Sequence, residues 1–162
     1  MSVRPALAAS LAALAGAAMA ASLDEQWSLD DGPDGVILQQ VSTTAIPDEY
    51  ATKEVNPRLR FHCAAGGVTA SIDWQRFISS FGTEVGFSVD GAKATWLKWG
   101  VDRSNRITLS PSTDDTQALL ALLEDATALQ VEVSPYSEGP VTVVFDVSNS
   151  TAALDALRAA CG

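Results

Sequence analysis

The chain has 162 residues, 47% of them hydrophobic, and its 20 Asp and Glu residues against 10 Lys and Arg give a net charge of −10. A chain this acidic repels phosphate backbones and anionic lipid headgroups, so no nucleic-acid partner is expected. Solubility alone explains the charge more simply than a cationic partner does.

The first 20 residues predict a secretory signal peptide. Arg4 supplies the positive start, residues 6–17 form an Ala/Leu stretch, and Ala18-Met19-Ala20 is a small-x-small cleavage site. The stretch is too short to span a bilayer, and no later segment reaches the roughly 18–20 apolar residues of a transmembrane helix. We therefore expect a signal peptide at 1–20, a single globular domain at 21–162, a periplasmic or secreted location and no membrane insertion after cleavage.

The first half of the mature chain predicts strands. Trp27–Leu29 and Val36–Thr43 flank an acidic turn, and Ile46–Pro57 is a polar connection. Arg58–Cys63 and Val68–Trp74 then alternate apolar and polar side chains around a turn at Gly66-Gly67, which predicts a hairpin. That register pairs Cys63 with Ala70, Phe61 with Ile72 and Leu59 with Trp74.

A second hairpin is expected over Glu84–Trp99, with a type I′ turn at Asp90-Gly91. A two-residue turn there pairs Val85 with Trp96. Trp96 then points into the core, and Trp99 points outward.

The last third of the chain changes to a helical period. Ser110–Asp115 is a typical helix start, because a hydroxyl caps the backbone and acidic residues favour the helix dipole. The apolar positions of this helix are Leu119, Leu122, Leu123 and Ala126. Strands are expected at Leu129–Val133 and Val141–Val147, and a final helix, capped by 148–150, places Leu154, Leu157 and Cys161 on one buried face.

These elements predict an α+β fold: a mostly antiparallel curved sheet or small β-sandwich of about eight strands, with two helices packed on it. The two cysteines, Cys63 and Cys161, both lie on apolar faces. In an oxidising compartment they predict a disulfide that links the C-terminal helix to the sheet.

Catalytic and metal-binding patterns are weak. His62 is the one histidine of the sequence, it falls on the outward phase of its strand, and no nucleophile motif accompanies it. Asp30, Asp31 and Asp34 suit a hairpin turn better than a calcium loop, because Pro33 interrupts the spacing. We therefore expect no catalytic residue, no metal ligand and no cofactor.

The best candidate interaction patch surrounds Trp99. An outward tryptophan beside Lys98, Arg103 and Arg106 is typical of a recognition surface. A core or edge position for Trp99 is an equal alternative.

The order of the elements resembles a known family. The stretch Arg58–Cys63 is followed by Ile72-Asp73-Trp74, a Val-x-Phe-x-Val-Asp-Gly hairpin at 85–91, a Phe-Asp-Val strand at 145–147 and a last helix that ends in the second Cys. Over residues 57–161 this resembles the VasI/TagO-type periplasmic proteins associated with type VI secretion, and related bacterial exported proteins. The resemblance implies an accessory role and no catalytic residues.

Three hypotheses on function follow. The leading one is an exported, non-enzymatic accessory or binding protein with a protein partner in the bacterial envelope. The second is a small envelope hydrolase or hydrolase inhibitor, which a deep polar pocket beside His62 would favour. The third is a small-molecule-binding domain, which a continuous apolar cavity in the concave face of the sheet would favour.

The cleavage site gives the first prediction. Protein recovered from the envelope fraction should begin at Ala21, within a residue or two, because Ala18 and Ala20 occupy the positions that signal peptidase reads. Intact-mass measurement checks this. Full-length protein in the cytoplasm would contradict export.

Overall fold

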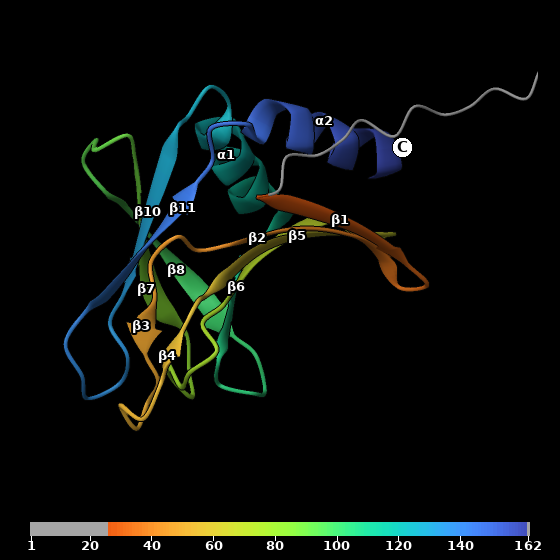
Figure 1. The fold of residues 1–162 in the computed structure, drawn as a ribbon. Helices are drawn as coiled ribbons and strands as arrows, with labels where there is room; N and C mark the ends of the chain where they lie inside the picture. The colour runs from red at the N-terminus through yellow and green to blue at the C-terminus, as the bar shows by residue number, and fades with distance from the viewer. Residues whose placement is uncertain (1–25, 162) are drawn as a thin grey trace, which may run out of the picture.

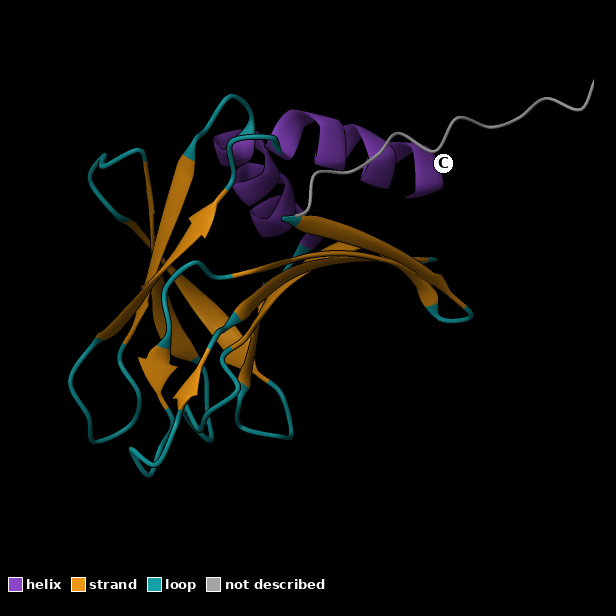
Figure 2. Cartoon of the chain, viewed as in Figure 1, coloured by secondary structure: helices purple, strands orange, loops and turns teal. Residues whose placement is uncertain are grey.

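The computed structural model describes residues 26–161, which form an antiparallel sheet of nine strands, a two-stranded ribbon and two helices (Figures 1 and 2). The sheet strands are β1 Trp27–Gly32, β2 Gly35–Val41, β5 Arg58–Ala64, β6 Gly67–Asp73, β7 Thr83–Val89, β8 Thr95–Val101, β9 Ile107–Leu109, β10 Ala128–Val133 and β11 Val141–Asp146. The ribbon is β3 Ile46–Pro47 and β4 Glu54–Val55, and the helices are α1 Thr113–Leu123 and α2 Ser150–Cys161. The predicted leader and its cleavage site lie outside the described residues.

The sheet has the strand order β1-β2-β5-β6-β9-β8-β7-β10-β11 and bends without closing into a barrel (Figure 1). The prediction of a mostly antiparallel curved sheet with two helices is confirmed in outline, but it missed β3, β4 and β9. All three are too short to show a hydrophobic period. β9 nevertheless joins the two halves of the sheet, since it pairs with β6 on one side and β8 on the other. No helix within residues 26–161 is long and apolar enough to cross a membrane.

The core fills the inner face of the bend. α2 packs on β1, β2 and β5, and α1 packs on β6. Leu59, Phe61 and Trp74 are fully buried there, and the indole N–H of Trp74 donates to Thr108 Oγ1 at 3.0 Å. Burial of apolar side chains at roughly 25 cal/mol per Å² is the main stabilising contribution to such a core.

The last strand is covered along its outer edge. Thr43 N donates to Val144 O at 2.8 Å, and Val144 N donates to Thr44 Oγ1 at 2.8 Å. The segment after β2 therefore satisfies backbone groups of β11 that a free edge would leave open to other chains.

The β5–β6 hairpin differs from the predicted register by two residues. Its turn is Ala65-Gly66, so Phe61 pairs with Ala70 and Leu59 with Ile72. Gly67, at a φ of 107°, supplies the left-handed backbone that lets it pair with Ala64. A shift of two leaves each side chain on its predicted face.

The β7–β8 hairpin differs by one residue, and this reverses its two tryptophans. Asp90 and Gly91 form the expected tight turn, closed by Ala92 N donating to Val89 O at 2.9 Å. Between this turn and the Phe87–Thr95 pair, Ser88 alone stands opposite two residues, Lys93 and Ala94, so the second strand carries one extra residue. Gly86 consequently pairs with Trp96. A one-residue slip turns every side chain to the opposite face.

The position of Trp99 is therefore corrected. Trp99 is 1% exposed and Trp96 is 47% exposed. Trp99 packs against Phe87 with ring centroids 5.0 Å apart, so it belongs to the core and not to a surface patch.

Helix α1 begins after Ser112, whose Oγ accepts from Asp115 N at 3.1 Å as predicted for a cap. The helix is rotated relative to the expected face: Leu120 is buried and Leu122 is 43% exposed. This rotation turns Thr116 inward. Thr116 is fully buried, and its hydroxyl accepts from Ala70 N on β6 at 3.1 Å.

The disulfide is confirmed. Cys63 and Cys161 are joined, with Cα atoms 5.8 Å apart. The bond connects the last turn of α2 to β5 and closes a long loop of the chain, which constrains the unfolded state.

We expect the double change Cys63→Ala and Cys161→Ala to lower the free energy of unfolding by roughly 2–5 kcal/mol. The amides of α2 should lose protection from hydrogen exchange before those of the β7–β8 hairpin, because the bond holds the helix end directly. Denaturant titration and amide exchange measure the two effects, and reduced wild-type protein is the control. Unchanged protection in α2 would contradict this role.

Candidate functional site

Four connections meet at one end of the sheet, which we call the loop end (lower part of Figure 1). They are the β3–β4 turn (48–53), the β6–β7 connection (74–82), the β8–β9 loop (102–106) and the β10–β11 loop (134–140). Backbone hydrogen bonds join them: Ile78 N donates to Asn105 O, and Tyr136 N donates to Ile78 O, each at 2.8 Å. The β6–β7 connection is thus held on both sides by its neighbours.

Arg76 is the buried centre of the loop end. Its side chain is 3% exposed. Nη1 donates to Pro47 O at 2.8 Å, and Nη2 donates to Glu138 Oε2 at 2.6 Å. One guanidinium thus joins β3, the β6–β7 connection and the β10–β11 loop through charge-assisted hydrogen bonds, the stronger class of such bonds. Its Nε has no hydrogen-bond partner among the described residues.

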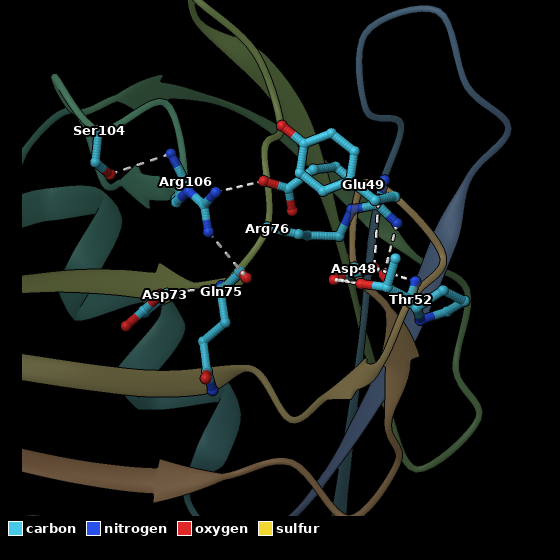
Figure 3. A network of polar contacts seen from close by, with 10 residues as sticks. Asp48, Glu49, Thr52, Asp73, Gln75, Arg76, Ser104 and Arg106 are labelled. Carbon is cyan, nitrogen blue, oxygen red and sulfur yellow. Dashed lines mark hydrogen bonds and ion pairs between the residues drawn. The ribbon is translucent and has the colours of Figure 1, made fainter.

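A polar pocket of about 310 Å³ opens beside Arg76. It is lined by Asp48, Glu49, Tyr50, Thr52, Lys53, Gln75 and Arg106. Figure 3 shows the Arg106 guanidinium reaching both the Glu49 carboxylate, as an ion pair, and the Gln75 backbone, where Nη1 donates to the carbonyl at 3.3 Å. These two contacts therefore fix the position of the Arg106 side chain on the side of the pocket that faces the sheet.

Asp48 shapes the β3–β4 turn. Its carboxylate accepts from Thr52 Oγ1 at 2.7 Å and from Thr52 N at 2.8 Å. The Thr52 hydroxyl, together with these backbone donors, holds the pKa of the Asp48 carboxyl below its ordinary value. Asp48 is therefore ionised at neutral pH and is occupied in holding the turn.

Three aromatic side chains stand out from the loop end. Tyr50 is 77% exposed, Phe81 64% and Tyr136 61%. Phe81 and Tyr136 meet edge to face with centroids 6.0 Å apart. Each lies in a polar, Gly- or Pro-containing segment, and an aromatic residue in such a segment is the sequence signal that could have identified this surface.

The predicted patch is only partly reproduced. Trp99 is buried, as described above. Lys98 lies on the outer face of β8 opposite Glu84, and Arg103 is exposed in the β8–β9 loop. Arg106 alone lines the pocket of the loop end, where Glu49 neutralises it.

His62 lies on the outer face of β5, half-buried, with Nε2 3.0 Å from Asp34 O. Two other cavities in the described part of the chain are lined by residues other than His62. One, of about 280 Å³, is mostly apolar and lies between α1 and α2 beside the disulfide. The other, of about 600 Å³, is lined by Gly82, Thr83, Glu84, Trp96 and Ser134. Within residues 26–161, no group of three or more His, Cys, Asp or Glu side chains is arranged to hold a metal ion.

Comparison with known proteins concerns the fold alone. No protein-family model matches the chain, and no curated protein matches it in sequence. Among solved structures, invasion associated protein B from Bartonella henselae has a similar fold, with a TM-score of 0.54 and 15% identity. The similarity covers 83% of this chain and 92% of that protein.

The burial of Arg76 yields a prediction about stability. We expect Glu138→Ala to lower the free energy of unfolding by about 1–2 kcal/mol. The change leaves the buried Arg76 guanidinium without its counter-charge, but the Glu138 side chain is 42% exposed and water screens the pair. Denaturant titration measures the change.

Glu124→Ala is the matched control. It also removes a carboxylate paired with an arginine, but both Glu124 and Arg158 are about half exposed, so we expect a loss of about 0–1 kcal/mol. Equal losses for the two variants would contradict the central position of Arg76.

Proposed function

We propose that this chain is an exported binding protein that recognises a protein partner in the bacterial envelope through its loop end. The observation that carries the proposal is the set of three exposed aromatic side chains, Tyr50, Phe81 and Tyr136, on three connections that Arg76 and its neighbours hold together. Large exposed aromatic residues contribute little to folding, whereas at interfaces they are among the strongest contributors to affinity.

The rigidity of the loop end supports a binding role. Side chains that are already positioned lose less conformational entropy when a partner binds. The hydrogen bonds of Arg76, the ion pair of Arg106 with Glu49 and the turn around Asp48 all fix the backbone beneath the aromatic residues. The polar pocket next to them adds hydrogen-bonding groups of the kind that form the rim of an interface.

The compartment is inferred from two features. Disulfides persist in oxidising compartments, and the Cys63–Cys161 bond ties the C-terminal helix to the sheet. The Ala-rich leader of residues 1–20 adds an export signal. The resemblance to the VasI/TagO-type proteins makes a component of an envelope machinery, such as a type VI secretion system, the class of partner that we propose.

The test compares two sets of substitutions at exposed apolar or aromatic residues. Tyr50→Ser, Phe81→Ser and Tyr136→Ser remove the aromatic residues of the loop end, and Val41→Ser with Leu122→Ser removes exposed apolar residues elsewhere. Each protein is exported through its own leader in the bacterium that encodes it and cross-linked in the envelope. The cross-linked partner is then purified and its affinity for each protein measured.

We expect the loop-end variant to bind the purified partner at least about tenfold more weakly, the loss typical of a hot-spot residue, while the control variant binds as the wild type does. Equal affinity for all three proteins would overturn the assignment to the loop end. An absence of any cross-linked partner would overturn the protein-binding function itself.

A further inference from the structure

The Trp96 indole packs on the outer face of the sheet, against the backbone of the neighbouring strand. It is the cross-strand partner of Gly86. A Cβ atom at position 86 would lie 3.0 Å from the indole atoms Cζ2 and Cη2 and 3.1 Å from Cε2. The six-membered ring therefore lies directly on the Gly86 backbone, and a side chain at position 86 would force the ring to shift by a few tenths of an ångström.

This packing leaves much of the indole exposed to solvent. Trp96 is 47% exposed, while Trp27, Trp74 and Trp99 are all buried. With one ring face against Gly86, the exposed surface includes the opposite face. A flat, immobilised aromatic surface open to solvent contributes little to folding and is a ready platform for a ligand.

A cavity of about 600 Å³ adjoins this platform, lined by Gly82, Thr83, Glu84 and Ser134 besides Trp96. The volume falls in the range of small-molecule sites. The hydroxyls of Thr83 and Ser134, the Glu84 carboxylate and the indole N–H make no hydrogen bond within the described part of the chain. The cavity thus combines one apolar platform with several donors and acceptors that have no protein partner.

This combination matches the chemistry of a sugar ring. A pyranose presents polarised C–H groups on its face, which suit the negative face of an indole, and hydroxyls around its edge, which suit mixed donors and acceptors. The charges nearby favour a neutral sugar. Glu132 is the cross-strand partner of Gly86 on β10, and Glu84 is the cross-strand partner of Lys98 on β8. Two carboxylates and one ammonium therefore surround the cavity, which leaves a net negative charge. An anionic saccharide would be repelled.

We propose that the Trp96 platform, with Thr83, Glu84 and Ser134, is a binding site for a neutral saccharide of the cell envelope. This site goes beyond the protein-binding function of the loop end, includes none of the three aromatic residues Tyr50, Phe81 and Tyr136, and is tested separately.

The test follows the indole N–H signals of the four tryptophans by NMR in the oxidised mature chain. The probe is the neutral trisaccharide of β-1,4-linked N-acetylglucosamine, titrated to about 10 mM, a range suited to the millimolar affinities of small shallow sites. We expect a saturable shift of the Trp96 signal and little change in the three buried tryptophans. Trigalacturonate, an anionic trisaccharide, should bind at least several-fold more weakly because of Glu84 and Glu132.

Two variants and one control make the assignment specific. Trp96→Ala should weaken binding at least about tenfold, followed through the backbone amides of Thr83 and Glu84. Gly86→Ala should also weaken binding, because the added Cβ displaces the indole. Tyr50→Ala, an exposed aromatic change at the loop end, should bind as the wild type does.

The outcomes separate the possibilities. The absence of a saturable shift with the neutral probe would overturn the saccharide site. Unchanged binding by Trp96→Ala would overturn the platform. If Trp96→Ala instead weakens only the affinity for the cross-linked protein partner, the surface belongs to a protein interface and the saccharide proposal is wrong, whereas the loop-end proposal stands.

Discussion

The register of the β7–β8 hairpin is the constraint on which both the core and the outer face of the sheet depend. Because one extra residue lies at 93–94, after the Asp90-Gly91 turn, Trp99 points inward against Phe87 and Trp96 points outward over Gly86. The opposite register would place Trp96 in the core and leave the cavity beside Glu84 without its aromatic wall. One residue in a turn thus decides which tryptophan stabilises the fold and which is available to a ligand.

The loop end depends on a buried charge. Arg76 joins three segments that are distant in sequence, and its burial is made tolerable by Pro47 O and the Glu138 carboxylate. Arg76 is the buried partner of this pair, whereas the Glu138 side chain is 42% exposed, and an ion pair with a buried partner contributes little net stability. Here it fixes the relative positions of the connections that carry the exposed aromatic residues, and those positions are what a binding surface requires.

The two proposed surfaces are neighbours along the chain. Phe81 of the loop end precedes Gly82 of the saccharide cavity, and Ser134 of that cavity begins the β10–β11 loop that carries Tyr136. The disulfide joins Cys63, at the edge of the core, to Cys161 in the last turn of α2, and that end of α2 lies across the molecule from the loop end (Figure 1). The disulfide shares no residue with either surface, so we expect substitutions in these surfaces to leave the disulfide and the packing of α2 intact.

Local patterns in the sequence predicted most strands, both helices with a hydroxyl cap on the first, and the pairing of Cys63 with Cys161. Alternation, capping and the placement of sulfur on apolar faces are properties of short segments, so they can be recognised without the tertiary structure. These patterns failed where one extra residue sets the register of a hairpin, or where a partner distant in sequence sets the position of a segment. One extra residue at 93–94 reversed the faces of Trp96 and Trp99. Helix α1 turns Thr116 inward, where its hydroxyl accepts from Ala70 N of β6. The three-residue strand β9 is defined by its pairing with β6 and β8, which no local pattern in its own sequence indicates. The loop end itself came from tertiary structure, because Arg76, Pro47 and Glu138 are far apart in the chain and only the bend of the sheet brings them together.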